Sequence, residues 1–427
     1  MPALMTQIAW PELAGIAGKE NLRAATEADC VDGVTPQMVC EPGTPEELAR
    51  SLRWASSNGL KVSPRGGGTK LGWGNPPLAC DLVLSTARLD RILEYAWDDM
   101  TVIVEAGCRV ADLQKTLAAH GQQLALDPLW PERASIGGIL STNDSGTLRA
   151  RYGSLRDLII GITVALPDGT LAKSGGKVVK NVAGYDLAKL FTGALGTLGV
   201  IVQAIFRLHP LPRQSRSLSF SGKPQSLNAL LLMLQASRLT FTGLQLHASQ
   251  EGARLDIRFD GTAAGIEAQI NQALQIASAS VTVCDTPADA WTSHQSIWDH
   301  ASPSSLAAPS LVVKFSVLPA QLASVAALLE KAADAHSLKW KLVAQSIGAG
   351  YAALEGNEIA LRSAALSLRD EVLALGGTMV FLGCPLSVKR GLDVWGPPSD
   401  AQPLMVRIKQ RFDPGGTLNA GRFAGGI

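Results

Sequence analysis

Glycine is the residue type that most constrains this chain, because 42 of its 427 residues are glycine, about 10% against a usual value of roughly 7%. The glycines gather in four clusters, at 65–69, 134–153, 193–199 and 412–423. The second cluster mixes glycines with hydroxyl residues over more than ten positions without a helical or strand period. Such a composition is typical of backbone that lies close to a ligand. The clusters therefore predict a site built largely from main chain.

The first cluster, Arg65-Gly66-Gly67-Gly68-Thr69, follows a short predicted strand at 61–63. Three successive glycines leave backbone N–H groups uncovered by Cβ atoms, and such a concave loop can bind a diphosphate. A flexible turn is the other interpretation of this segment when it is taken alone. The functional interpretation depends on the remaining clusters.

Charge and hydropathy exclude several classes of protein. Lys and Arg number 38 and Asp and Glu 37, so no basic excess is present to bind nucleic acid. No apolar stretch approaches the roughly 20 residues of a membrane span, and the N-terminus lacks the apolar segment of a secretory signal. The six cysteines form no Cys-x-x-Cys pair, which favours reduced thiols and gives no support to a zinc or iron–sulfur site in this chain alone. We expect a cytoplasmic protein that reaches a membrane only through partner subunits.

The order of predicted elements gives an α+β protein in three parts. Residues 1–213 read as an α/β domain that ends at a proline-flanked exit, Pro210-Leu211-Pro212. Residues 214–390 read as an α/β cap in which a β-α-β-β-α-β pattern, the split-βαβ or ferredoxin-like arrangement, occurs twice. Its expected strands lie at 217–220, 241–247, 253–259, 281–284, 311–317, 339–345, 350–354 and 378–382, and its helices at 224–236, 263–277, 320–335 and 358–375. Residues 391–427 read as a linker and a short C-terminal tail.

Together the four clusters resemble one known family, the FAD-binding domain of the vanillyl-alcohol oxidase / p-cresol methylhydroxylase (PCMH) type, which has two subdomains. The resemblance covers roughly residues 35–212 and 405–423. It rests on the loop 65–69 and on four further segments: Ser135-Ile136-Gly137-Gly138 with Arg151-Tyr152-Gly153, Pro167-Asp168-Gly169, 181–186 with 196–201, and the tail 413–423. The resemblance implies FAD as the cofactor and a tail that returns to it.

Within that family, the run 176–187 is similar to the FAD-binding (E) subunits of glycolate oxidase. Members with covalently bound flavin carry a histidine after the loop glycines, where this chain has Thr69, so the resemblance implies noncovalent FAD. It also implies oxidation of a small 2-hydroxy acid, glycolate or D-lactate, with electrons passing to flavoprotein and iron–sulfur partner subunits.

The resemblance assigns the cofactor site to one set of residues: Arg65, Gly66, Gly67, Gly68, Thr69, Ser135, Ile136, Gly137, Gly138, Thr142, Gly146, Tyr152, Gly153, Gly199, Ile201 and Asn419. No catalytic residue is identified. A hydroxy acid needs a cation for its carboxylate, and the candidates are Lys314, Lys180 and Arg422, whose alternative role is packing or surface charge.

Related D-2-hydroxyacid dehydrogenases carry a metal-binding His-x-Gly-Asp-Gly-Asn-x-His segment that this chain lacks. We therefore predict no metal, and we expect His294 and His300 to lie on a helix surface. Two functions stay open. The chain is either a flavoprotein oxidoreductase, or a flavin-holding, assembly or electron-relay subunit whose partner oxidises the substrate. An α/β protein without a cofactor would make four glycine clusters a coincidence.

Overall fold

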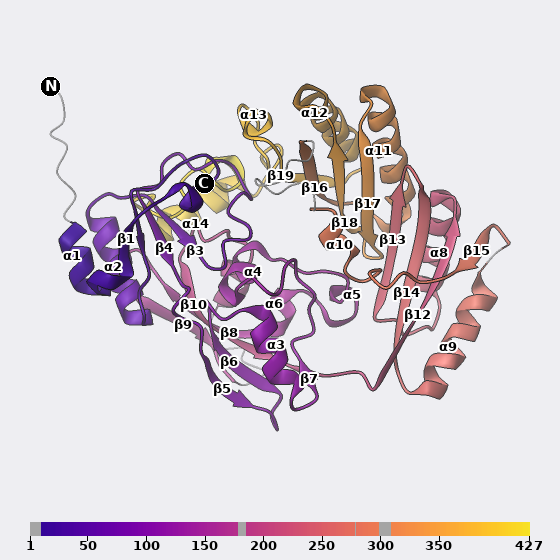
Figure 1. The fold of residues 1–427 in the computed structure, drawn as a ribbon, viewed down its shortest axis with the longest axis horizontal. Helices are drawn as coiled ribbons and strands as arrows, with labels where there is room; N and C mark the ends of the chain where they lie inside the picture. The colour runs from indigo at the N-terminus through magenta and orange to yellow at the C-terminus, as the bar shows by residue number, and fades with distance from the viewer. Residues whose placement is uncertain (1–9, 178–184, 278, 299–308) are drawn as a thin grey trace.

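The computed structural model describes residues 10–177, 185–277, 279–298 and 309–427. Figure 1 shows an N-terminal part in indigo and magenta beside a second part in pink and orange, with the yellow tail back on the N-terminal part. Strand β12 (Gln214–Gly222) leads from one part into the other.

The first subdomain is a four-stranded sheet in the order β1-β2-β4-β3, with β2, β4 and β3 parallel. Its strands are β1 (Leu22–Ala24), β2 (Met38–Cys40), β3 (Val62–Arg65) and β4 (Leu82–Ser85), and its helices are α1 (Trp10–Ala17) and α2 (Pro45–Ser57). Helix α2 begins where it does because the Thr44 hydroxyl accepts the Glu47 N–H at 3.1 Å and Pro45 occupies the first turn. Its apolar face, with Leu48 and Leu52, is fully buried.

The second subdomain is a five-stranded antiparallel sheet in the order β5-β6-β10-β8-β9. Its strands are β5 (Ile92–Ala96), β6 (Thr101–Glu105), β8 (Ile159–Ala165), β9 (Leu171–Gly175) and β10 (Val200–Arg207). Its helices are α3 (Val110–Ala118), α4 (Ile136–Thr142), α5 (Arg149–Tyr152), α6 (Leu155–Leu158) and α7 (Leu187–Phe191), and a short pair joins β7 (Gln122–Gln123) to β11 (His209–Pro210). Ile136, Ile139 and Leu140 of α4 are buried against this sheet, which places the start of α4 beside the loop after β3.

The cap is one eight-stranded sheet in the order β15-β12-β14-β13-β17-β18-β16-β19. Its first half runs β12, α8 (Pro224–Ala236), β13 (Gly243–Ser249), β14 (Gly252–Gly261), α9 (Ala263–Ile276) and β15 (Val281–Cys284). Its second half runs β16 (Ser310–Ser316), α11 (Leu322–His336), β17 (Lys339–Gln345), β18 (Ala349–Glu355), α12 (Glu358–Ala374) and β19 (Thr378–Gly383). Both halves follow the order read from the sequence, and β13 pairs with β17 where they meet.

The cap helices lie on one face of the sheet, away from the N-terminal part (Figure 1). Side chains alternate along each strand, so Leu311, Val313 and Phe315 join the core under the helices. Val312 of the same strand faces the other way and packs in a cluster with Trp73 and Leu195 of the N-terminal part. The helix-free face of the cap sheet is therefore the surface that meets the N-terminal domain.

The C-terminal segment is more ordered than the sequence predicts. Helix α14 (Gln402–Phe412) precedes the tail, where the sequence reading has only a linker and a short tail. Leu418 then forms a parallel bridge with Val62 of β3. The remaining short helices are η1 (Lys19–Asn21), η2 (Glu27–Asp29), α10 (Ser293–Ser296), η3 (Pro319–Gln321), α13 (Leu386–Lys389) and η4 (Ala424–Gly426).

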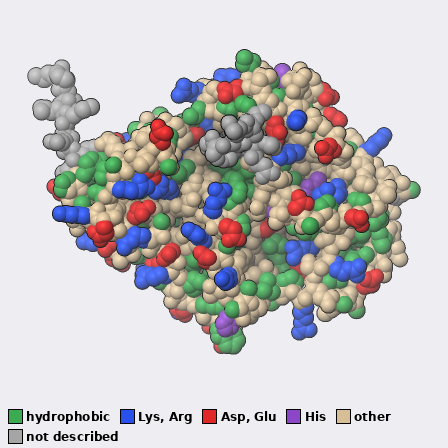
Figure 2. All heavy atoms as spheres, in the orientation of Figure 1, with side chains coloured by type: hydrophobic (Ala, Val, Ile, Leu, Met, Phe, Trp, Pro, Cys, Tyr) green, Lys and Arg blue, Asp and Glu red, His purple; other side chains and the backbone are tan. Residues whose placement is uncertain are grey.

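On the face drawn in Figure 2, acidic and basic side chains are interspersed, in keeping with the net charge of +1. Within the described part of the chain, no helix is both long and apolar enough to cross a bilayer. All six cysteines are free thiols.

Candidate functional site

A cavity opens in the N-terminal domain where the loop after β3, helix α4, the turn before β10 and the C-terminal tail meet. Its walls are formed by Pro64, Arg65, Gly66, Gly67, Gly68, Thr69, Lys70, Leu71, Thr86, Ser135, Gly137, Gly138, Ser141, Thr142, Leu195, Gly196, Gly199, Val200, Ile201, Asn419 and Arg422. All four glycine clusters of the sequence contribute to these walls. Segments more than 350 residues apart thus share one cavity.

Most residues that the resemblance assigned to the cofactor line this cavity: Arg65, Gly66, Gly67, Gly68, Thr69, Ser135, Gly137, Gly138, Thr142, Gly199, Ile201 and Asn419. Four others lie elsewhere. Ile136 is buried in the core below α4, Gly146 packs against Asp127, and Tyr152 lies 4.8 Å from the His209 ring. Gly153 ends α5 with φ +85°. The structure thus gathers twelve of the sixteen, and the assignment of all sixteen to FAD stays a prediction.

The loop glycines are required by close backbone packing. A Cβ on Gly66 would lie 2.0 Å from the Ser135 Oγ, and one on Gly67 would lie 1.8 Å from the Arg133 carbonyl oxygen. The missing Cβ atoms therefore make room for the 133–135 segment, which the sequence reading had not foreseen. By contrast, the exposed Gly72 has open space where its Cβ would be.

Several loop amides are left for a ligand, among them those of Gly68 and Thr69. The Gly67 N–H donates to the Ser135 hydroxyl at 3.3 Å. Among the residues that the structure describes, the N–H groups of Gly68 and Thr69 have no acceptor, and Gly68 is exposed at the cavity. Unpaired N–H groups on a concave loop are the donors that a diphosphate accepts from.

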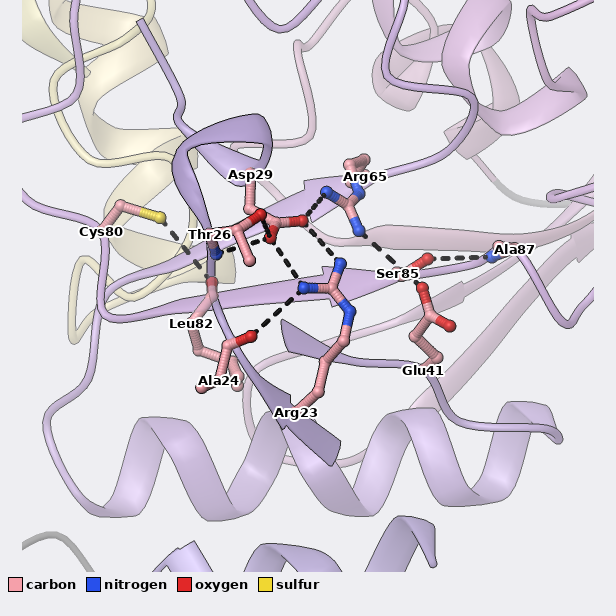
Figure 3. Close-up of polar contacts among 10 residues, drawn as sticks. All are labelled: Arg23, Ala24, Thr26, Asp29, Glu41, Arg65, Cys80, Leu82, Ser85 and Ala87. Atoms are coloured by element: carbon pink, nitrogen blue, oxygen red, sulfur yellow. Dashed lines mark hydrogen bonds and ion pairs between the residues drawn. The ribbon is translucent and has the colours of Figure 1, made fainter. Parts of the chain in front are cut away.

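A charged network fixes the strand that carries the loop (Figure 3). Asp29, only 2% exposed, accepts hydrogen bonds from Arg23 at 2.7 Å and from Arg65 at 2.7 Å. The Arg23 guanidinium is the largest cause that holds the pKa of Asp29 well below its usual range, and Arg65 adds to it although burial acts in the opposite direction. Arg65 therefore lines the cavity while its guanidinium is held by a carboxylate.

The C-terminal tail closes another wall through buried polar side chains. Asn419 accepts from the Ser63 hydroxyl at 2.8 Å and donates to the Leu195 carbonyl at 2.7 Å. Arg422, 2% exposed, donates to the carbonyls of Leu71, Trp73 and Asn75. Burial lowers the pKa of Arg422 to about 10. The guanidinium of this candidate substrate anchor is thus used by the protein's own backbone.

Lys70 of the cavity wall forms a buried ion pair with Asp144. The Lys70 ammonium lies 3.0 Å from an Asp144 oxygen, with side-chain exposures of 5% and 1%. Lys70 also lies over the rings of Trp73 and Trp130, at 5.7 and 5.5 Å from their centroids. Trp298 of the cap stacks on Trp73 at 5.6 Å. The pair therefore sits under the aromatic contact between the two domains.

Lys314 lies on the helix-free face of the cap sheet, and its ammonium is 5.8 Å from the centroid of the Tyr351 ring. Burial lowers the pKa of Lys314, and the nearby Asp144 partly offsets this. Within the described residues Lys314 has neither an ion-pair nor a hydrogen-bond partner. The third anchor candidate, Lys180, lies outside the described residues.

The expectation for the histidines is wrong at His294. Its segment forms only the four-residue helix α10, and the imidazole is buried at 4% exposure instead of lying on a helix surface. Burial lowers its pKa. His300 lies outside the described residues. The described part of the chain holds no group of three or more His, Cys, Asp or Glu side chains placed to bind a metal ion.

The fold and the cavity define a class: a two-subdomain α+β nucleotide-binding domain joined to a cap, with a main-chain-rich cavity in the first part. Residues 36–175 match the family described as "FAD binding domain". This segment is therefore an FAD-binding domain, and FAD is its cofactor. The cavity can hold FAD, because the glycine clusters at 65–69, 134–153 and 193–199 line it. The 65–69 loop also has unpaired backbone N–H groups that can donate to the diphosphate.

Similar curated proteins match the same part of the chain. Glycolate oxidase subunit GlcD of Bacillus subtilis is 36% identical over 183 residues, which are 43% of this chain and 39% of that protein. D-lactate dehydrogenase of Archaeoglobus fulgidus is 35% identical over 176 residues, 41% of this chain and 39% of that protein. The match thus spans about two fifths of the length of these curated relatives.

Among solved structures, p-cresol methylhydroxylase with bound substrate superposes with a TM-score of 0.77 at 14% identity, over 96% of this chain and 95% of that one. An alkyldihydroxyacetonephosphate synthase superposes with a TM-score of 0.69 at 17% identity, over 96% of this chain and 85% of that one. These likenesses establish the fold across both domains.

Four cavity residues lie outside the motifs singled out in the sequence, namely Pro64, Lys70, Leu71 and Thr86. The first three adjoin the 65–69 loop, so extending that motif by one or two residues would have included them. Four others, Ser141, Leu195, Gly196 and Val200, lie within the glycine-rich segments but were not assigned to the cofactor. The Lys70–Asp144 pair had no such signal, because a contact across 74 positions leaves no mark on a single sequence.

Proposed function

We propose that this chain is an FAD-dependent oxidoreductase subunit that oxidises a small 2-hydroxy acid, glycolate or D-lactate, to the 2-oxo acid. The observation that carries the proposal is the cavity itself. Glycine-rich segments of an FAD-binding domain line it, and Lys70 of its wall is paired with the buried Asp144. Relatives over this domain are named for glycolate and D-lactate.

Bound FAD supplies a two-electron acceptor that takes hydride from a carbon held against it. The chain's own contribution is to bind and orient the acid and to keep water away. The stacked Trp73 and Trp298 rings, both buried, lie at the contact between the two domains and can serve this purpose. Noncovalent retention of FAD is part of the proposal, since Thr69 stands where a covalent histidine would be needed.

Lys314 is the best of the three anchor candidates for the substrate carboxylate. Arg422 is occupied by backbone carbonyls, whereas Lys314 is a partly buried cation without a described ion-pair or hydrogen-bond partner. A charge-assisted hydrogen bond from such an ammonium can contribute about 1.5–3 kcal/mol. Its position on the face of β16 that meets the N-terminal domain supports this role.

The second candidate function is a flavin-holding, assembly or electron-relay subunit of a complex with flavoprotein and iron–sulfur partners. It is favoured by one sequence observation, the missing His-x-Gly-Asp-Gly-Asn-x-His segment of related dehydrogenases. In that case the partner oxidises the substrate.

Anaerobic spectroscopy of the purified chain distinguishes the two. We expect a yellow protein whose 450-nm band bleaches when glycolate or D-lactate is added without any partner. Bleaching that requires partner subunits would select the second function. A colourless protein that cannot be reconstituted with FAD would contradict both.

A further inference from the structure

Three buried polar groups between the domains have atoms without a hydrogen-bond partner. They are the Asp144 Oδ1, the Tyr351 hydroxyl and both ring nitrogens of His294. Each side chain is at most 4% exposed. Buried polar atoms are nearly always paired, because leaving one unpaired in the interior is costly. A cluster of them therefore points to a partner that arrives from outside.

Asp144 is held in place by one of its oxygens only. Its Oδ2 accepts from the Leu129 N–H at 3.0 Å and lies 3.0 Å from the Lys70 ammonium. The second oxygen, Oδ1, is left free within the described structure. Lys70 lines the cavity, so the pair extends from the cavity wall to the buried junction.

Tyr351 links this carboxylate to the cap. Burial raises the pKa of its phenol well above the ordinary value, and the charge of Asp144 raises it further. The ammonium of Lys314 lies over the ring of the same tyrosine. Tyr351 therefore lies between the Lys314 ammonium and the Asp144 carboxylate. A 2-hydroxy acid needs such a pair, because the cation can bind its carboxylate and the carboxylate oxygen can accept a hydrogen bond from its hydroxyl group.

Resting on the proposed function, we propose that Asp144 is the proton acceptor for the substrate hydroxyl and that the Tyr351 hydroxyl positions that oxygen. In this step the O–H bond breaks and its proton goes to Asp144 Oδ1. Bound FAD would supply the two-electron acceptor for the hydride that is released as the C2–H bond breaks and the C2–O bond becomes a carbonyl. The Lys70 ammonium, 3.0 Å from the other oxygen, orients the carboxylate for this role.

Asp144→Asn tests the proposal, with the exposed Asp334→Asn as a matched control. General-base catalysis contributes about 10²–10⁴-fold, so anaerobic flavin reduction by the hydroxy acid should slow by at least about 100-fold. The control should reduce at the wild-type rate. Photoreduction needs no hydroxyl proton and should be unchanged in both variants.

Binding supplies a readout that is independent of turnover. Oxalate, followed by its perturbation of the flavin spectrum, should bind Asp144→Asn at least as tightly as wild type, because the variant loses only a negative charge. Tyr351→Phe should slow reduction less than Asp144→Asn does.

The double variant Lys70→Met/Asp144→Asn separates chemistry from structure. Replacing both members of a buried ion pair by neutral groups is often harmless to stability. We expect the double variant to fold, to retain FAD and to remain slow. Wild-type rates in Asp144→Asn, or recovery of the rate in the double variant, would contradict the assignment of Asp144 as proton acceptor. The proposed function would be unaffected by either result. A wild-type flavin that no 2-hydroxy acid reduces would overturn both the assignment and the proposed function.

Discussion

The cavity wall and the cap sheet use their buried cations in opposite ways. In the wall, Arg65 is held by Asp29, and Arg422 donates to three backbone carbonyls. In the cap, Lys314 is partly buried beside Tyr351, with no described anion or carbonyl paired to its ammonium. A buried charge is costly unless it is paired. The difference teaches that the wall's cations hold the fold, whereas the cap's cation is available to a ligand.

The largest effect is expected at the loop itself. In Gly67→Ala the new Cβ would meet the Arg133 carbonyl at 1.8 Å, so the backbone must move and the loop amides shift. We expect flavin content after gel filtration to fall at least tenfold. Gly72→Ala, a few residues along, has open space and should keep its flavin. Equal flavin in both variants would contradict the packing argument.

Arg422→Met should cost stability. Removing the guanidinium leaves the buried carbonyls of Leu71 and Trp73 without their donor, so the free energy of unfolding should drop by about 3–5 kcal/mol. Denaturant unfolding of the FAD-loaded protein measures this. Arg411→Met, at an exposed position of α14, is the matched control and should stay near wild type. If Arg422 instead anchored substrate, its variant would be stable but inactive.

Lys314→Met should show the reverse pattern. Because no described group pairs with this ammonium, stability should hold, while kcat/KM for the hydroxy acid falls about 10–100-fold, as expected for a charge-assisted bond of about 1.5–3 kcal/mol. Lys339→Met, an exposed lysine on β17, is its control. Since burial lowers the Lys314 pKa, substrate affinity should weaken on the alkaline side earlier than for an ordinary lysine. An unchanged kcat/KM in Lys314→Met would contradict the proposal that Lys314 binds the substrate carboxylate.

The smallest effect is expected at Asp29. Its pKa is held below the usual value in the folded chain, so its stabilisation is complete above the unfolded pKa of about 3.9 and is lost as the pH falls below it. Asp29→Asn should lower stability by about 1–3 kcal/mol at pH 7 and by less near pH 3. Arg23→Gln, at a half-exposed partner, should cost less. A loss independent of pH would contradict the charge network.

The two regions also differ in how far the sequence could predict them. In the cap, helix α8 and strands β15 and β17 begin and end where the sequence reading put them. Apolar periodicity and turn residues are local signals, and they are strong there. The repeated order of elements was predictable for the same reason.

At the site, the glycine-rich composition predicted the position of the 65–69 loop, but not the segments that pack against it. The glycines at 66 and 67 were read as room for a ligand, whereas they make room for the 133–135 segment. The burial of His294 and the Lys70–Asp144 pair depend on how the cap meets the N-terminal domain. Such contacts are set by tertiary packing, which one sequence does not encode as a local pattern. Helix α14 was not predicted, because its segment was assigned together with the glycine-rich tail that follows it.

The most direct test of the account is an experimental structure of the purified, FAD-loaded chain. We predict one noncovalent FAD in the cavity, with its diphosphate on the amides of Gly68 and Thr69 and its flavin end toward Lys70. FAD bound elsewhere, or a diphosphate held by side chains away from the 65–69 loop, would contradict the central claim.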